Sequence, residues 1–460
     1  MCRSKADGGR ICPCQSSARR SAKYKAKKAA AALGDKPTIG ARGVSDTPGG
    51  VFPEGMPARE AFERLRAGWD ADAAKNIIAT VNGLSDSELE GAAGDAIIAA
   101  YPDMTGAMLS AENKRGLDGV TRRDAVRAVV AVEVGCALAA EADRDVDLAR
   151  AREAVREAKG AEQEALKERK AAVARREEAR DAYEAAKERG DFDEAQRLVD
   201  DVIALRMVSD ESYRRWSNAL NGVVRANSVL SDARRDAYMR LLSQVRDMGG
   251  GFDAKAVFAP RSSVAGKKIV QGASRLYPSD WNKLFSDPLN NRVKVLMRDG
   301  RDVGSALSEY GSYQHVASRD RDGSIASALR MVERGESGQN EETACHEMMH
   351  RMERVVPGMV GVEQAFLRYR AADSNHGALY PNFSVKRGAP EGYSDSFPRV
   401  YAGRVYDTKE PYAFEVMSVG AEHVFYGRNG DLSIAGNVEG KPSQADSEYR
   451  GFVLGVLASL

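Results

Sequence analysis

The chain has 460 residues, enough for about two to four domains and at least one large hydrophobic core. Its 68 lysines and arginines are balanced by 67 acidic residues, so the overall charge neither favours nor excludes a polyanionic partner. The longest mostly apolar stretch, residues 128–140, contains Glu133 and is too short to cross a bilayer. We therefore expect no membrane-spanning helix.

Residues 1–50 are expected to form a basic, disordered arm followed by a linker. Lysine and arginine are frequent in residues 1–30, where Asp7 is the single acid, and glycine, proline, threonine and serine are frequent in residues 31–50. The arm lacks the continuous apolar segment of a secretory signal, so we expect a cytoplasmic protein. Its positive charge makes nucleic acid a candidate partner.

The cysteines indicate no disulfide framework. Cys2, Cys12 and Cys14 lie in the arm, whereas Cys136 and Cys345 lie far apart in the rest of the chain. Such scattered cysteines fit a reducing compartment. The three in the arm are too few for a four-ligand zinc site, and no histidine lies near them in sequence. We expect free thiols there, with a small metal site as the alternative.

Residues 51–141 predict a small helical region. Amphipathic segments in it are separated by breaks at residues 82–83, 101–102 and 116–119, where glycine or proline occurs. Its apolar residues are suited to a modest core rather than to a catalytic pocket.

Residues 142–248 predict a long antiparallel helical hairpin of coiled-coil type. Alanine and charged residues dominate, proline is absent, and one break occurs at residues 190–193. Apolar residues spaced by three and four on the second arm should line the seam: Leu198, Val202, Leu205 and Val208. We interpret the hairpin as a spacer or an element of self-association.

Residues 252–460 predict an α+β domain, because aromatic, β-branched and turn residues are mixed there. We expect strands at residues 256–259, 292–297 and 313–317, and helices at residues 325–334 and 443–460. The segment 340–356 is expected to form a further helix. Asn340 is its predicted N-cap, Glu341 and Glu342 fall in its first turn, Arg351 and Arg354 near its end, and Pro357-Gly358 should stop it.

That helix contains the only H-E-x-x-H of the chain, formed by His346, Glu347 and His350. Histidines four apart on a helix project from one face, so their ring nitrogens can share one metal ion. Thr343 and Glu353 are expected on the same polar face. A carboxylate at Glu347 can take a proton from metal-activated water, which is the chemistry of zinc peptidases.

Catalytic zinc needs a third protein ligand beside the two histidines. The extended metzincin pattern is excluded, because Glu353 and Val356 stand where it requires glycine and histidine. We predict Glu415 as the third ligand. The rival candidates for this role are Glu422, Glu410, His376 and His423. The candidates for steadying an oxyanion, with packing as the commoner role of such side chains, are Tyr401, Arg404, Tyr406 and His423.

The segment Tyr412–Glu422 resembles the E-x-x-S element of thermolysin-like gluzincins, in which the glutamate is the third zinc ligand. Glu415 and Ser418 fill that pattern, but Val419 stands in place of the family's following aspartate, which orients a histidine. The runs 397–406 and 415–422 also resemble uncharacterised HExxH proteins of bacteriophages and bacterial mobile elements. This resemblance spans roughly residues 270–460 and implies a zincin-like fold without naming a substrate.

We therefore expect a zinc-dependent peptidase, encoded by a phage or mobile element, that acts on a peptide or protein substrate. His346, His350 and Glu415 would hold Zn²⁺, and Glu347 would be the general base. The strand at residues 313–317 is expected to pair with an extended substrate. The alternatives are a non-catalytic structural protein of head-morphogenesis type with a zincin-like domain, located in the virion, and a nucleic-acid-associated protein that binds through its basic arm.

Overall fold

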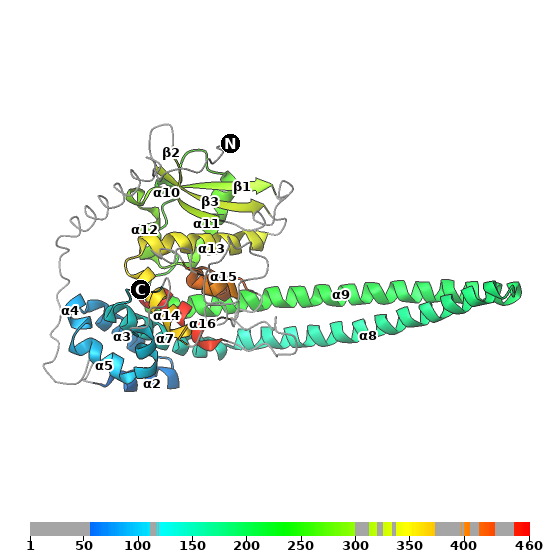
Figure 1. The fold of residues 1–460 in the computed structure, drawn as a ribbon, viewed down its shortest axis with the longest axis horizontal. Coiled ribbons are helices and arrows are strands. Elements are labelled where there is room, and N and C mark those ends of the chain that lie inside the picture. The colour runs from blue at the N-terminus through cyan, green and yellow to red at the C-terminus, as the bar shows by residue number, and fades with distance from the viewer. Residues whose placement is uncertain are drawn as a thin grey trace, which may run out of the picture. The chain divides into compact units, whose positions relative to one another are not determined.

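A computed structural model of the protein describes residues 56–110, 117, 119–299, 312–319, 325–333, 337–372, 397, 400–404, 414–427 and 446–460. These residues are mostly helical, and long helices are prominent among them (Figure 1). The predicted basic arm, with Cys2, Cys12 and Cys14, lies outside the described residues. No helix among those that the structure describes is long and apolar enough to cross a membrane.

The predicted small helical region consists of short helices that pack around one long helix, α7 (Arg122–Asp143). Thr121 caps α7 through a reciprocal bond with Asp124, and most side chains of this helix are buried. The predicted breaks after Gly83 and before Pro102 are confirmed. The short helices are α2 (Ala58–Ala67), α3 (Ala71–Gly83), α4 (Asp86–Leu89), α5 (Ala92–Ala100) and α6 (Pro102–Met108).

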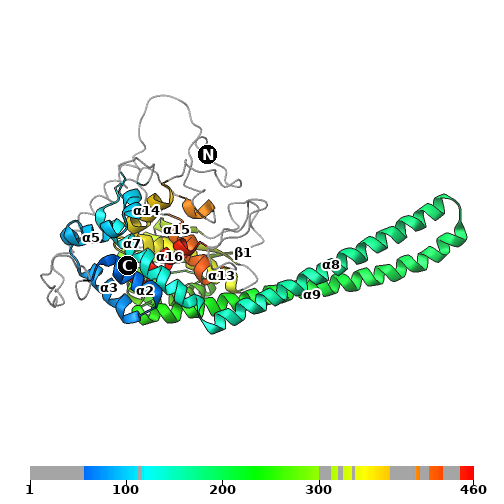
Figure 2. The ribbon, with the colours of Figure 1, turned by 90° about the horizontal axis from the view of Figure 1, so that it is seen from below.

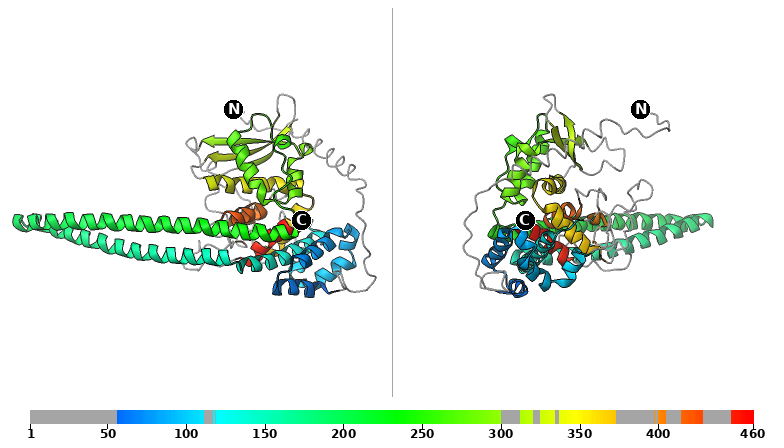
Figure 3. Two further views of the ribbon diagram at one scale, coloured as in Figure 1. Left: turned by 180° about the vertical axis from the view of Figure 1, so that it is seen from behind. Right: turned by 60° about the vertical axis from the view of Figure 1, so that its left-hand side comes forward.

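The long hairpin is confirmed as α8 (Val146–Glu188) and α9 (Phe192–Val245), which run side by side in both views of Figure 3. Gly190 turns the chain between them with φ +73, a left-handed conformation that glycine adopts without strain. The predicted seam is right at Leu198, Val202 and Leu205, which are half-buried, but wrong at Val208, which is 52% exposed. Ser209 is buried instead, because the three-four spacing continues through position 209 and not 208.

Three strands within the described residues form a sheet in the C-terminal half, with strand order β1-β3-β2. Strands β1 (Arg292–Asp299) and β2 (Ser312–Arg319) are confirmed, and β2 is an edge of this sheet. The helix predicted at 325–334 is wrong, since this segment is β3 (Ile325–Glu333), parallel to β1 and antiparallel to β2. A short run with alternating buried residues such as Leu329 and Met331 suits a central strand whose backbone bonds are satisfied on both sides.

The strand predicted at residues 256–259 is also wrong. The side chain of Asp253 accepts hydrogen bonds from the backbone amides of Lys255 and Ala256. It thereby acts as the N-cap of a short helix, α10 (Ala254–Val257). The end of the segment contacts β1, through a parallel bridge between Phe258 and Val293 and a bond from the amide of Ala259 to the carbonyl of Val293.

The motif helix is α13 (Ser337–Val355), which lies between the sheet and α15 (Val416–Phe425) (Figure 1). It ends just before Pro357-Gly358 as predicted, and Gly358 has φ +83. Asn340 is not its N-cap, because the helix begins three residues earlier. None of Ser337, Gly338 and Gln339 breaks a helix as proline would.

The remaining helices complete the packing around α13. On one side lie α11 (Val264–Ala273) and α12 (Ser279–Ser286), with the 3₁₀ turns η2 (Ser274–Leu276) and η3 (Pro288–Asn290). Helix α14 (Met359–Arg370) follows α13 directly, and the 3₁₀ turn η6 (Val400–Gly403) packs on α15.

The C-terminal helix α16 (Ser447–Ser459) confirms the helix predicted at 443–460 and is almost entirely buried. It contacts α7, α9 and α15, and Figure 2 shows it among the helices of the body. The predicted small helical region therefore shares its core with the segment that carries the motif. Residues 49–460 form one compact unit.

Candidate metal centre

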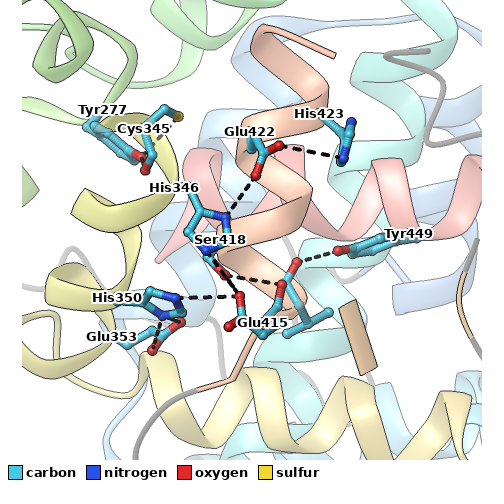
Figure 4. Close-up of polar contacts among 11 residues, drawn as sticks. Tyr277, Cys345, His346, His350, Glu353, Glu415, Ser418, Glu422, His423 and Tyr449 are labelled. Carbon is cyan, nitrogen blue, oxygen red and sulfur yellow. Dashed lines mark hydrogen bonds and ion pairs between the residues drawn. The ribbon is translucent and has the colours of Figure 1, made fainter. Parts of the chain in front are cut away.

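The two histidines of the motif lie on one face of α13, with ring centroids 5.0 Å apart. Nε2 of His346 lies 3.2 Å from Oε2 of Glu415, and Nε2 of His350 lies 3.5 Å from the same oxygen (Figure 4). One ligand atom from each of these three residues lies within 4.8 Å of the others. The structure thus brings together the three residues that the sequence singled out as a ligand set.

Glu415 reaches the histidines from the start of α15. Its backbone carbonyl accepts a hydrogen bond from the amide of Val419, and its own amide donates to the carbonyl of Arg404. Hydrogen bonds therefore fix both the amide and the carbonyl of this residue. The Ser418 hydroxyl donates to Oε2 of Glu415 at 2.8 Å. The spacing of Glu415 and Ser418 therefore has a physical purpose, because the serine fixes the carboxylate one turn before it.

Glu422 does not join this set but contacts His346 from the opposite side. Nδ1–H of His346 donates to Oε2 of Glu422 at 2.9 Å. Two helical turns separate Glu415 from Glu422, so the two carboxylates lie on one face of α15 with His346 between them (Figure 4). His423 lies further out, with Nε2 3.9 Å from Oε1 of Glu422.

His350 has a comparable contact within α13. Its Nδ1 lies 3.3 Å from each carboxylate oxygen of Glu353, one turn later on the helix. The predicted polar face is therefore correct in placing Glu353 beside the histidines. What the sequence did not indicate is that Glu353 is buried.

A further buried acid, Glu363 on α14, was not anticipated from the sequence. Neither of its carboxylate oxygens has a hydrogen-bond partner in the described part of the chain. Burial, followed by the nearby charge of Glu353, raises its pKa well above the usual range. Glu353 and Glu363 are ten residues apart on neighbouring helices, which matches no motif spacing, so no sequence signal could have found Glu363.

The charges of the cluster depend on one another. Burial lowers the pKa of His346, but the carboxylates of Glu415 and Glu422 outweigh it and raise that pKa to about 10. Burial likewise opposes protonation of His350, and Glu353 and Glu415 outweigh it. Conversely, the two histidines overcome burial and hold the pKa of Glu415 well below its usual range. Without a metal, the centre is a carboxylate between two imidazolium rings.

Glu347 lies on α13 between the two histidines but does not belong to the cluster of His346, His350 and Glu415. Its side chain is 3% exposed, and its Oε2 has no hydrogen-bond partner among the residues that the structure describes. Burial raises its pKa to about 7, although the charges of His346 and His350 oppose the rise. The group is therefore a buried carboxyl that titrates near neutral pH.

Two buried contacts anchor α13 behind the centre. Arg351 lies near the end of α13 as predicted, and its guanidinium donates to the carbonyls of Phe285 and Asn291. The hydroxyl of Tyr277 donates to the carbonyl of Cys345 at 2.6 Å. Both contacts reach the motif helix from the α12 side and limit its rotation about its own axis.

Tyr401 lies beside His346, and Arg404 lies beside Tyr401. The ring of Tyr401 lies 6.4 Å from that of His346 at an interplanar angle of 19°, and the guanidinium of Arg404 lies 5.6 Å from the centre of the Tyr401 ring. An oxyanion-stabilising role for either stays a prediction. His376, Tyr406 and Glu410 lie outside the described residues.

Comparison with known proteins adds nothing to this geometry. No family model matches the chain, and neither a curated protein nor a solved structure shows significant similarity to it. The resemblance to gluzincins and to phage HExxH proteins therefore stays an inference from motifs.

The donor set fits a divalent metal ion. Two imidazole nitrogens and one carboxylate oxygen are the ligands used by catalytic zinc sites, although the same set also accepts other first-row metals. A ligand nitrogen must lose its proton before it binds a metal.

Metal binding is accordingly expected to release protons. Because His346 and His350 are both protonated at neutral pH in the metal-free protein, one ion should displace about two protons, and its affinity should rise up to ~100-fold per pH unit. Calorimetric titration with zinc in buffers of different ionisation enthalpy would count the protons. An affinity that does not change between about pH 6 and 8 would contradict the expectation.

Proposed function

We propose that this protein is a metal-dependent peptidase in which His346, His350 and Glu415 hold zinc. The convergence of these three side chains on one point carries the proposal. When bound, zinc would supply Lewis acidity, which lowers the pKa of a coordinated water and polarises a carbonyl. The placement of the motif helix beneath a small mixed sheet supports a zincin-like arrangement for this part of the chain.

In this proposal Glu347 is the general base. Its buried position and its pKa of about 7 allow it to accept a proton near neutral pH and to return it to the leaving amine. Among the described strands β2 lies at an edge of the sheet, and in this proposal an extended peptide pairs with its outer side, which would orient the substrate.

The hairpin of α8 and α9 favours a second candidate function, that of a non-catalytic structural protein. Several large apolar side chains of α9, among them Ile203, Met207 and Val224, are exposed along its length. Such side chains favour association with another protein or a second copy over a role in catalysis.

Metal analysis of purified protein tests the proposal. We expect about one zinc ion per wild-type chain and far less than one in His346→Ala and Glu415→Ala, because two ligands seldom retain zinc. Glu341→Gln is the matched control, since Glu341 lies on α13 and contacts Tyr426 rather than the cluster.

The same preparations would be tested on a peptide library. Cleavage by the wild type that chelator abolishes and zinc restores is the expected result. A wild type that binds zinc and cleaves no peptide would favour the structural alternative. Full zinc occupancy in Glu415→Ala would remove the assignment of the third ligand.

A further inference from the structure

The gluzincin pattern places an aspartate where this chain has Val419, and a valine cannot orient a histidine. The two rings of the centre are nevertheless both held at Nδ1. His346 donates to Glu422, and Nδ1 of His350 faces Glu353. We propose that Glu422 and Glu353 are the positioning residues of this centre, in a role that rests on the proposed metal site.

The contact geometry supports this role. Each imidazole has its Nδ1 directed at one carboxylate and its Nε2 directed at Oε2 of Glu415 (Figure 4). An Nδ1–H that donates to a carboxylate leaves the lone pair of the neutral ring on Nε2, the atom that faces the cluster. The outer carboxylates therefore select the tautomer that a metal needs on both rings.

The two positioning residues act from different elements. Glu353 lies one turn after His350 on α13, so its contact forms with the motif helix itself. Glu422 lies on α15, so its contact forms only when α15 packs on α13. His346 is thereby fixed by two carboxylates of one helix, Glu415 and Glu422, on opposite sides of its ring.

Burial gives these contacts their strength. The side chain of Glu353 is fully buried and that of Glu422 is 18% exposed, so water competes weakly for either carboxylate. A carboxylate partner also makes the opposite ring nitrogen more basic and a better ligand.

The test compares leucine and glutamine variants at each position. Glu422→Leu and Glu353→Leu remove the acceptor, and we expect each to lower zinc affinity about 10- to 100-fold in competition with a chromophoric chelator. Glu422→Gln and Glu353→Gln keep an oxygen that accepts the Nδ1–H and are expected to recover part of the loss. Glu341→Leu is the control and should bind as the wild type does. Thermal unfolding of every variant shows whether the fold is kept.

A second readout does not depend on the metal. In the metal-free protein, nitrogen-detected NMR of the histidine side chains should show a hydrogen-bonded Nδ1–H on His346 and on His350. Glu422→Leu should remove the first signal and Glu353→Leu the second. Folded leucine variants that keep both signals and zinc affinity within about twofold of the wild type would overturn the inference. A wild type that binds no zinc would instead overturn the proposed metal site, and the two NMR signals would still decide whether these carboxylates hold the rings.

Discussion

Glu347→Gln is expected to lower the turnover of peptide cleavage by about 10²- to 10⁴-fold while the protein keeps its zinc. The amide has nearly the shape of the carboxyl but cannot accept the proton of the attacking water. Glu347 is absent from the cluster of His346, His350 and Glu415, so its replacement should leave the ligand set intact. The measurement is the turnover number on a cleaved peptide, with zinc content determined on the same sample.

The control for this variant is Glu341→Gln, which changes the same type of side chain on the same helix. It should retain wild-type turnover. Undiminished turnover in Glu347→Gln would exclude the residue as general base. Loss of zinc together with turnover would show instead that Glu347 supports the ligands.

Gly455→Ala is expected to destabilise the fold by about 3 kcal/mol or more. A Cβ at this position of α16 would lie 1.7 Å from the backbone carbonyl oxygen of Ala131 on α7. Backbone cannot move aside as a flexible side chain does, so the two helices would have to separate. The same close approach involves Gly135, whose Cβ would lie 1.7 Å from the carbonyl oxygen of Gly451.

Gly160→Ala is the matched control, because nothing lies within 4 Å of a Cβ at that position of α8. It should stabilise the protein by about 0.5–1 kcal/mol through the helix propensity of alanine. The free energies of unfolding would be measured by chemical denaturation. Gly455→Ala with a stability within about 0.5 kcal/mol of the wild type would contradict the packing of α7 on α16.

This packing also matters for the metal centre. The hydroxyl of Tyr449 on α16 donates to the carbonyl of Val416, the residue after Glu415. Val453, one turn later on α16, faces Gly420 of α15, where a Cβ would lie 2.4 Å from its side chain. Displacing α16 is therefore expected to displace the helix that presents Glu415 and Glu422.

Local sequence signals were sufficient to predict the long helices and the helix that carries the motif. The i, i+4 spacing of His346 and His350 needs only a helix to bring the rings together, and Pro357-Gly358 ends that helix wherever it packs. The hairpin was equally readable, because a break at Gly190 between two proline-free segments leaves little choice of structure.

The secondary structure of short apolar segments could not be predicted from local sequence. Residues 325–333 suit a buried strand or a buried helix, and β1 and β2 decide between them by offering backbone partners on both sides. Residues 256–259 meet a described strand at one point, where Phe258 bridges Val293 and the amide of Ala259 donates to the carbonyl of Val293. The seam position at Ser209 rather than Val208 follows from the geometry of two helices in contact, which outweighs the apolar character of a single residue.

The choice of the third ligand among the carboxylates shows most clearly what local sequence determines and what helix packing determines. Helical spacing places Glu415 and Glu422 on one face of a helix, and from the chain alone only the resemblance of Glu415 and Ser418 to the E-x-x-S element favours Glu415. Packing of α15 on α13 places Glu415 against both Nε2 atoms and Glu422 against Nδ1 of His346. Spacing along one helix is a local property, whereas the side of a ring that a distant carboxylate reaches depends on how two helices pack.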